Sequence, residues 1–168
     1  MFKLKSRKAL IATTIAAAIV AGSSTALAGI TTPASTLNSN LKVAYNYAWL
    51  GDATSQYNCL AYALGNYSSW VWPWGSSNPT SSQVDTYLYN KGYKYGQGMD
   101  SQNVAFYEII SYGTSSSIGH FGRFADTVNG TTYSNAKWGQ LELLQHQGWS
   151  PYTSNGVYGD AYRKYAKQ

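Results

Sequence analysis

Cysteine is almost absent from this sequence, and the single one present limits what the chain can do. Cys59 is the only cysteine among 168 residues, so an internal disulfide is excluded. In an exported protein, such a residue is an intermolecular linker, a buried filler or a reactive thiol. Free cysteines often only fill space in a core, but a thiol kept outside the cell favours a chemical use.

Charged residues are also scarce, at 11% of the chain, and they are unevenly distributed. Of the 12 Lys and Arg residues, four lie in the first eight positions: Lys3, Lys5, Arg7 and Lys8. Without them the chain has 12 − 4 = 8 basic residues against 7 acidic ones, which leaves it almost neutral. No basic cluster remains there, so we expect no nucleic-acid partner.

Long apolar runs are missing beyond the N-terminus, and the N-terminus itself has the pattern of a bacterial signal peptide. Its basic start is followed by a mostly apolar run from Ala9 to Ala21 and by Ala26-Leu27-Ala28, a small-x-small cleavage site. The apolar run is shorter than the roughly 20 residues of a membrane-spanning helix. We predict cleavage after Ala28 and a secreted or cell-wall protein without a membrane span; an uncleaved anchor is the alternative.

The remaining chain predicts one domain. Residues 1–28 form the signal peptide, residues 29–40 predict a flexible leader rich in Thr, Ser and Asn, and residues 41–168 suit a single domain with its own core. The sequence says nothing about its oligomeric state.

Periodicity and turn signals within this domain predict an α+β fold. Val84, Tyr87 and Leu88 recur at helical spacing and predict a helix over 81–90. Asn129-Gly130 is a strong hairpin signal between two predicted strands. The predicted strands are residues 103–112, 118–128 and 131–135. Residues 140–146 predict one or two helical turns, and residues 156–165 predict a final edge strand, with a helix as the alternative.

The stretch around Cys59 predicts a nucleophile at a helix start. Leu60, Ala61, Ala63 and Leu64 are good helix formers, and Gly65 is a common terminator. Cys59 would then lie in the first turn, where backbone N–H groups and the helix dipole favour a thiolate. A lone cysteine in this position with a distant histidine is typical of Cys–His nucleophilic catalysis.

His120 follows 61 residues later, near the start of a predicted strand. The pair Asn58-Cys59 at a helix start and the run Gly119-His120-Phe121 on a strand together resemble the papain-like superfamily of cysteine hydrolases. The closest resemblance is to bacterial cell-wall endopeptidases and CHAP-type amidases. It implies a papain-like α+β fold, in which an N-terminal helix with the cysteine packs on a small antiparallel sheet with the histidine. No cofactor is implied.

The third catalytic residue departs from the family pattern. Papain-like proteases carry Asn-Ser-Trp-Gly on the next strand, and alignment on Trp138-Gly139 puts Ala136 at the asparagine position. With a two-residue turn and no bulge, His120 would lie opposite Gly139, and Asn135 would share its face. Asn135 is therefore the predicted orienting residue, with a backbone carbonyl, water or Ser134 as alternatives.

The resemblance implies acyl transfer to Cys59 with His120 as base, and hydrolysis of a peptide or amide bond. The expected substrate is a peptidoglycan stem peptide or an extracellular protein. The oxyanion would be held by the Cys59 N–H and a nearby donor, with Gln56, Tyr57 and Asn58 as candidate oxyanion and support residues.

Tryptophan forms a second conspicuous pattern. Trp70, Trp72 and Trp74 alternate and would share one face of an extended segment. They predict either a platform that binds substrate, together with Trp138, or a lid whose indoles are buried over the core.

Other catalytic patterns are missing. The two histidines and one cysteine do not form the four-ligand clusters of structural zinc sites, and no metal is expected. The phosphate-binding glycine loop and the Gly-x-Ser-x-Gly elbow are also absent. His146, in a predicted helical stretch, is expected to have a polar surface role. The alternative function is a non-catalytic papain-like module that binds wall glycan or a partner through its aromatic segments.

Overall fold

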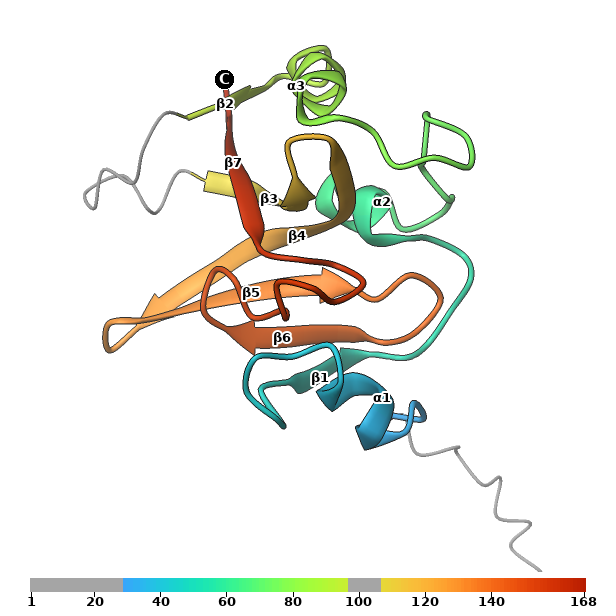
Figure 1. Ribbon diagram of the computed structural model, residues 1–168, viewed down its shortest axis with the longest axis vertical. Helices are drawn as coiled ribbons and strands as arrows, with labels where there is room; N and C mark the ends of the chain where they lie inside the picture. Colours follow the sequence, from blue (N-terminus) through green and yellow to red (C-terminus); the bar gives the residue numbers. More distant parts are fainter. Residues whose placement is uncertain (1–28, 97–106) are drawn as a thin grey trace, which may run out of the picture.

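A seven-stranded antiparallel sheet dominates the fold (Figure 1). The computed structural model describes residues 29–96 and 107–168. The strands are β1 (Ala48–Gly51), β2 (Tyr93–Tyr95), β3 (Tyr107–Thr114), β4 (Ser117–Val128), β5 (Thr131–Lys137), β6 (Leu143–Gln147) and β7 (Ala161–Lys167). They are ordered β1-β6-β5-β4-β3-β7-β2. Three short helices accompany them in the described residues: α1 (Ala34–Asn38), α2 (Cys59–Ala63) and α3 (Ser81–Tyr89). The predicted α+β class is confirmed.

Two apolar clusters occupy the two faces of the sheet. On one face, α2 and α3 pack through Leu60, Val84 and Leu88 against Ile109 and Phe121. On the other face, α1, the residues that follow it and the segment between β6 and β7 contribute Leu37, Leu41 and Tyr152 to a cluster with Tyr112 and Trp138. The alternation of side chains along each strand produces this division, because neighbouring residues point to opposite faces.

The β4–β5 hairpin forms as its turn residues predict. Asn129 and Gly130 both have positive φ, 50° and 77°. Val128 pairs with Thr131 directly next to this turn. A bulge between Phe124 and Asp126 then shifts the register by one residue.

The helix over 81–90 is also confirmed: α3 ends at Tyr89, and Thr80 and Gln83 form a capping box at its start. The predicted strand over 118–128 corresponds to β4. Of the predicted strand over 103–112, residues 103–106 lie outside the described residues, and the remainder lies in β3.

Three expectations along the chain are wrong. Residues 140–146 contain the start of strand β6, because pairing with β5 and β1 overrides the helix propensity of Leu and Gln. The C-terminal strand β7 lies between β3 and β2 and is not an edge. The leader over 29–40 contains α1, whose Leu37 is fully buried, so this segment packs on the domain.

None of the helices in residues 29–96 and 107–168 is long and apolar enough to cross a membrane.

Candidate functional site

Cys59 is the first residue of helix α2, as predicted. The Oδ1 atom of Asn58 accepts a hydrogen bond from the Ala61 N–H at 3.0 Å, which caps the helix. The same side chain donates through Nδ2 to the Val71 carbonyl at 2.8 Å. Asn58 therefore fixes the helix start and the tryptophan segment at once.

Burial determines the charge state of the thiol. Cys59 is only 5% exposed, and this burial raises its pKa to about 11. The backbone N–H groups of Phe121, Leu60 and Cys59 itself favour the thiolate, but they do not offset the loss of solvent. The expectation of a thiolate at this helix start is wrong for the resting protein, in which Cys59 is a neutral thiol.

His120 lies in β4 within an aromatic cage. Its Nε2 atom is 3.3 Å from the hydroxyl of Tyr152, and the ring of Tyr158 stacks on the imidazole at 3.9 Å between centroids. His120 is buried, and burial, with a smaller effect of His146, holds its pKa well below the usual value. The imidazole is therefore neutral near pH 7.

One pocket brings Cys59 and His120 together. It has a volume of about 310 Å³. Its lining consists of Asn58, Cys59, Trp70, Trp72, Gly75, Gly119, His120, Gly139 and Tyr158. Within the described residues, no hydrogen bond joins the thiol to the imidazole, whose Nε2 atom is paired with Tyr152.

Asn135 does not lie beside His120, and its assignment as the orienting residue is wrong. The bulge in the hairpin pairs Asn135 with Arg123, three residues beyond His120 along β4. Because β4 pairs regularly with β3 over this stretch, positions 120 and 123 point to opposite faces of the sheet. The Oδ1 atom of Asn135 instead accepts a hydrogen bond from Gln145 at 3.2 Å.

Tyr152 takes the place expected of Asn135. It lies in the connection between β6 and β7, and its hydroxyl is the hydrogen-bond partner of the His120 ring among the described residues. Tyr152 and Tyr158 were missed because they are distant in sequence from the Cys–His motifs. The only signal was the run of tyrosines near the C-terminus.

Of the three predicted oxyanion and support residues, only Asn58 lines the pocket. Gln56 is exposed, and neither it nor Tyr57 lines the pocket. Tyr57 packs edge-on against Tyr67 at 5.6 Å between centroids. The side chain of Asn58 lines the pocket but is already committed to the helix cap and to Val71. The backbone N–H of Cys59 lies in the first turn of α2 and has no partner within the helix, so it remains the candidate oxyanion donor.

The tryptophans have divided roles. Trp70 and Trp72 line the Cys59 pocket, and Trp70 is 48% exposed. Trp72 and Trp74 also pack on Phe121, so this part of the segment covers the core. Trp138 is 2% exposed and does not line the pocket, so its assignment as a substrate-binding residue is wrong.

Lys137 is a buried cation next to the pocket. Its Nζ donates to the carbonyls of Thr54 at 2.9 Å and Gly139 at 2.7 Å, and also to that of Leu141. Burial lowers the pKa of Lys137 to about 8, while Glu142 and Cys59 act in the opposite direction. The ammonium group thus stabilises the turn that contains Gly139, whose φ is 59°. Gly139 in turn lines the pocket.

His146 is also buried, which contradicts the surface role expected for it. Its Nε2 accepts a hydrogen bond from Trp138 Nε1 at 3.0 Å, and its Nδ1 lies 2.7 Å from the Asn46 carbonyl. An indole N–H only donates, so the proton of the neutral ring lies on Nδ1. Burial lowers the pKa of His146 to about 4, against the raising effect of the Asn46 carbonyl.

The part of the chain that the structure describes has no candidate metal site. That part contains no group of three or more His, Cys, Asp or Glu side chains placed to share an ion. The Glu142 carboxylate accepts four hydrogen bonds of 2.7–2.9 Å from Thr31 and Thr32.

Comparison with known proteins assigns the chain to a family. The model of a family described as a domain of unknown function, DUF7689, matches residues 48–166. No curated protein and no solved structure matches the sequence. The matched range includes Cys59, His120, Tyr152 and Tyr158. Since it covers well over half of the 168 residues, the chain belongs to the DUF7689 family, a domain of unknown function.

Proposed function

We propose that this protein is an exported bacterial cysteine hydrolase with a papain-like site, which cleaves peptide or amide bonds of the cell wall or of extracellular proteins. The observation that carries the proposal is the shared pocket of Cys59 and His120, the only cysteine and one of only two histidines in the chain. A nucleophile, a base and a group that orients the base are the minimum that such chemistry requires.

One of the two tautomers of the His120 imidazole is suited to a base. If Nε2 carries the proton and donates to the Tyr152 hydroxyl, Nδ1 presents its lone pair to the pocket. Stacking by Tyr158 restricts rotation of the ring about this bond. Tyr152 thus supplies the orientation that an asparagine supplies in the papain-like pattern.

The neutral resting pair implies that proton transfer accompanies attack. As Cys59 Sγ bonds to the carbonyl carbon, the thiol proton moves to Nδ1 of His120. The oxyanion that forms accepts a hydrogen bond from the Cys59 backbone N–H. The imidazolium then gives that proton to the amide nitrogen as the C–N bond breaks and the amine leaves. Water attacks the thioester, gives a proton to His120, and releases the acid, while the proton returns to Sγ.

The pocket favours small, neutral groups next to the scissile bond. Its lining includes three glycines and two tryptophans, and no lining side chain carries a charge once His120 is neutral. Wall stem peptides with alanine beside the cleaved bond fit this chemistry better than strongly charged segments do.

Digestion of purified bacterial wall sacculi tests the proposal. We expect the protein to release new amino groups, identified by mass spectrometry of the fragments, and we expect Cys59→Ser and His120→Gln to abolish this release while circular dichroism shows an intact fold. Release of amino groups that persists in Cys59→Ser would refute the assignment of Cys59 as the nucleophile. Wall binding without any release would favour the non-catalytic module instead.

A further inference from the structure

A buried carboxylate binds the residues that directly follow the predicted signal-peptide cleavage site. Glu142 is fully buried and lies in the connection between β5 and β6. It accepts hydrogen bonds from the backbone N–H groups of Thr31 and Thr32, at 2.7 and 2.9 Å, and from their hydroxyls, at 2.9 and 2.7 Å. Burial acts to raise the pKa of Glu142, but the bonds from Thr32 and Thr31 outweigh it and hold the pKa at about 2. An ionised, buried carboxylate therefore fixes residues 29–32, which we call the N-terminal strap.

The nitrogen of Gly29 lies next to a second carboxylate. It is 3.1 Å from Oδ1 of Asp52, at an exposed position just after the end of β1. Signal-peptide cleavage after Ala28 adds water across the Ala28–Gly29 peptide bond. The released peptide takes the oxygen as a carboxylate, and the Gly29 nitrogen takes the protons and becomes an α-ammonium group. Its bond to Asp52 then joins two opposite charges.

The strap contacts both of the segments that carry the walls of the Cys59 pocket. It bonds to the loop that runs from β1 towards α2 and to the connection between β5 and β6. The first segment leads to Cys59 and the second contains Gly139, and both of these residues line the pocket. Lys137 joins the same two segments by donating to the carbonyls of Thr54 and Gly139. The strap is thus a second connection between the two walls.

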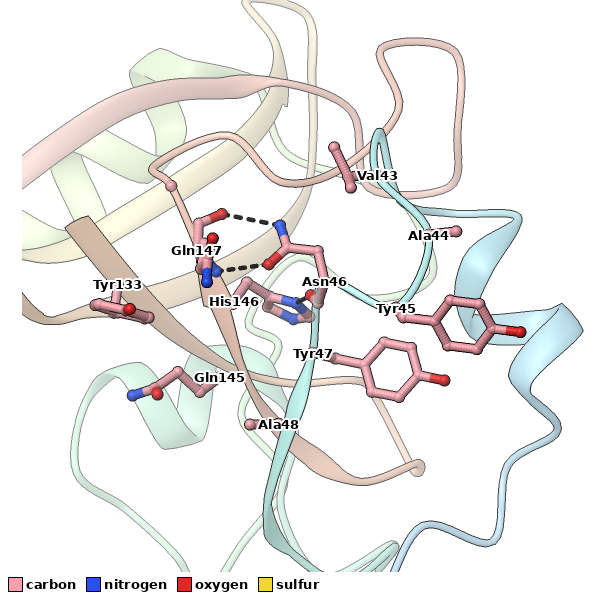
Figure 2. Close-up of a pocket in the computed structure, with 11 residues that line it drawn as sticks. Val43, Ala44, Tyr45, Asn46, Tyr47, Ala48, Tyr133, Gln145, His146 and Gln147 are labelled. Atoms are coloured by element: carbon pink, nitrogen blue, oxygen red, sulfur yellow. Dashed lines mark hydrogen bonds between the residues drawn. The ribbon is translucent and has the colours of Figure 1, made fainter. Parts of the chain in front are cut away.

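The chain that follows the strap is itself held in place. Leu37 of α1 is fully buried, and the side chain of Asn38 accepts a hydrogen bond from the Tyr45 N–H at 2.8 Å. Figure 2 shows the side chain of Asn46 bonded to both backbone groups of Gln147 in β6, with the N–H donating at 2.8 Å and the carbonyl accepting at 2.9 Å. Because α1 and the segment after it are fixed, docking of the strap orders only a few further residues.

We propose that signal-peptide removal creates the ligand of this site: the new α-ammonium group of Gly29 pairs with Asp52, while the strap docks on Glu142 and holds the two walls of the Cys59 pocket in position. Glu142 and Asp52 are therefore positioning residues. The proposal depends on cleavage after Ala28 and does not depend on hydrolysis by Cys59, because docking affects the packing around the thiol whether or not the thiol is catalytic.

Sequencing of the amino terminus of the protein secreted by a bacterial host tests the first step. We expect Gly29 as the first residue. Any other first residue would overturn the proposal, because the α-ammonium group would no longer lie beside Asp52.

Two chains with defined starts test the pairing of the α-ammonium group. One starts at Gly29 and the other at Ala26, which keeps the strap but leaves a peptide amide at Gly29. We expect the first chain to have a melting temperature about 2 °C higher at low ionic strength, since exposed ion pairs contribute little. Asp52→Asn should remove this difference. Equal melting temperatures of the two chains before the substitution would overturn the pairing.

Removal of the strap hydroxyls tests its link to the pocket. Thr31→Val combined with Thr32→Val keeps the shape of both side chains and removes two donors to Glu142. We expect the melting temperature to fall by about 5 °C or more. Alkylation of Cys59 by iodoacetamide at pH 8 should become about threefold faster or more, because the loosened walls expose the thiol.

Two control variants separate this effect from a general loss of stability. Thr36→Val, at an exposed position of α1, should change neither the melting temperature nor the alkylation rate. Tyr165→Phe loses a hydrogen bond of 2.9 Å to Asp85, away from the strap, and should lower the melting temperature without faster alkylation. An unchanged alkylation rate in the double threonine variant, or an equal increase in Tyr165→Phe, would overturn the proposal.

Discussion

The hydroxyl oxygen of Tyr152 lies 3.3 Å from Nε2 of His120, and both side chains are buried. The tyrosine comes from the connection between β6 and β7, whereas the histidine is in β4. Their contact joins the sheet to the segment that covers its second face. It also suggests how an imidazole can be oriented without the asparagine of the papain-like pattern.

Removal of this hydroxyl should affect activity more than stability. Tyr152→Phe keeps the ring, so we expect the free energy of unfolding to change by no more than about 1.5 kcal/mol, the typical contribution of one hydrogen bond. We expect kcat/KM for amide release to fall roughly tenfold, because the tautomer of His120 is no longer fixed. Asn135→Ala is the matched control and should retain activity. Equal activity of Tyr152→Phe and the wild type would contradict the orienting role.

The raised pKa of Cys59 predicts slow, strongly alkaline alkylation. Burial raises this pKa to about 11, so the thiolate fraction should still be increasing at pH 10, where an ordinary thiol of pKa about 8.5 has levelled off. Iodoacetamide labelling followed by intact mass from pH 6 to 11 measures the profile. A plateau below pH 7, lost in His120→Gln, would instead indicate a thiolate–imidazolium pair at rest.

The buried His146 should make the fold sensitive to acid. Burial lowers its pKa from 6.5 to about 4, so between these values the unfolded chain binds a proton that the native chain does not. The stability that comes from the neutral ring is therefore complete above about pH 6.5 and lost as the pH falls through 4. The shift corresponds to at most about 3 kcal/mol.

Urea unfolding at several pH values tests this expectation. The free energy of unfolding should fall between pH 6.5 and 4 in the wild type, and less steeply in His146→Gln, which has no titrating ring. His120 titrates in the same direction and contributes to the slope that remains. Identical slopes for the two proteins would show that His146 is not the group responsible.

Asn58 should stabilise both α2 and the tryptophan segment. Asn58→Ala removes the helix cap and leaves the Val71 carbonyl without its donor, so we expect a loss of about 2 kcal/mol in the free energy of unfolding. Asn58→Ser retains a cap acceptor and loses the Nδ2 donor, so its loss should be smaller. Thermal and urea unfolding of both variants measure the difference, and equal losses would argue against a separate contribution from the helix cap.

Lys137 should be needed for folding stability because its ammonium group satisfies three carbonyls. Lys137→Met keeps most of the apolar stem but leaves the Thr54, Gly139 and Leu141 oxygens without this donor. We expect a loss of about 3 kcal/mol in the free energy of unfolding. Lys91→Met, at an exposed position on the turn after α3, is the control and should change stability little. A Lys137→Met protein as stable as the wild type would show that water replaces the ammonium group.

The sequence alone determined the local features near the candidate nucleophile and base. The helix start at Cys59, the helix over 81–90, the strand with His120 and the Asn129-Gly130 turn follow from capping, periodicity and positive φ, which act between residues close in the chain. Local patterns of this kind predict the structure wherever a particular residue type satisfies a particular requirement of the backbone, such as a helix cap or a positive φ.

Tertiary structure decided the partners of these residues. A single bulge at Phe124 changed the face on which Asn135 lies, and pairing with β1 and β5 made a strand of residues that favour a helix. The approach of Tyr152 to His120 and the burial that keeps Cys59 neutral depend on segments far apart in the sequence. Such contacts arise from the packing of the whole sheet, and a one-residue change in register reverses the direction of every side chain beyond it.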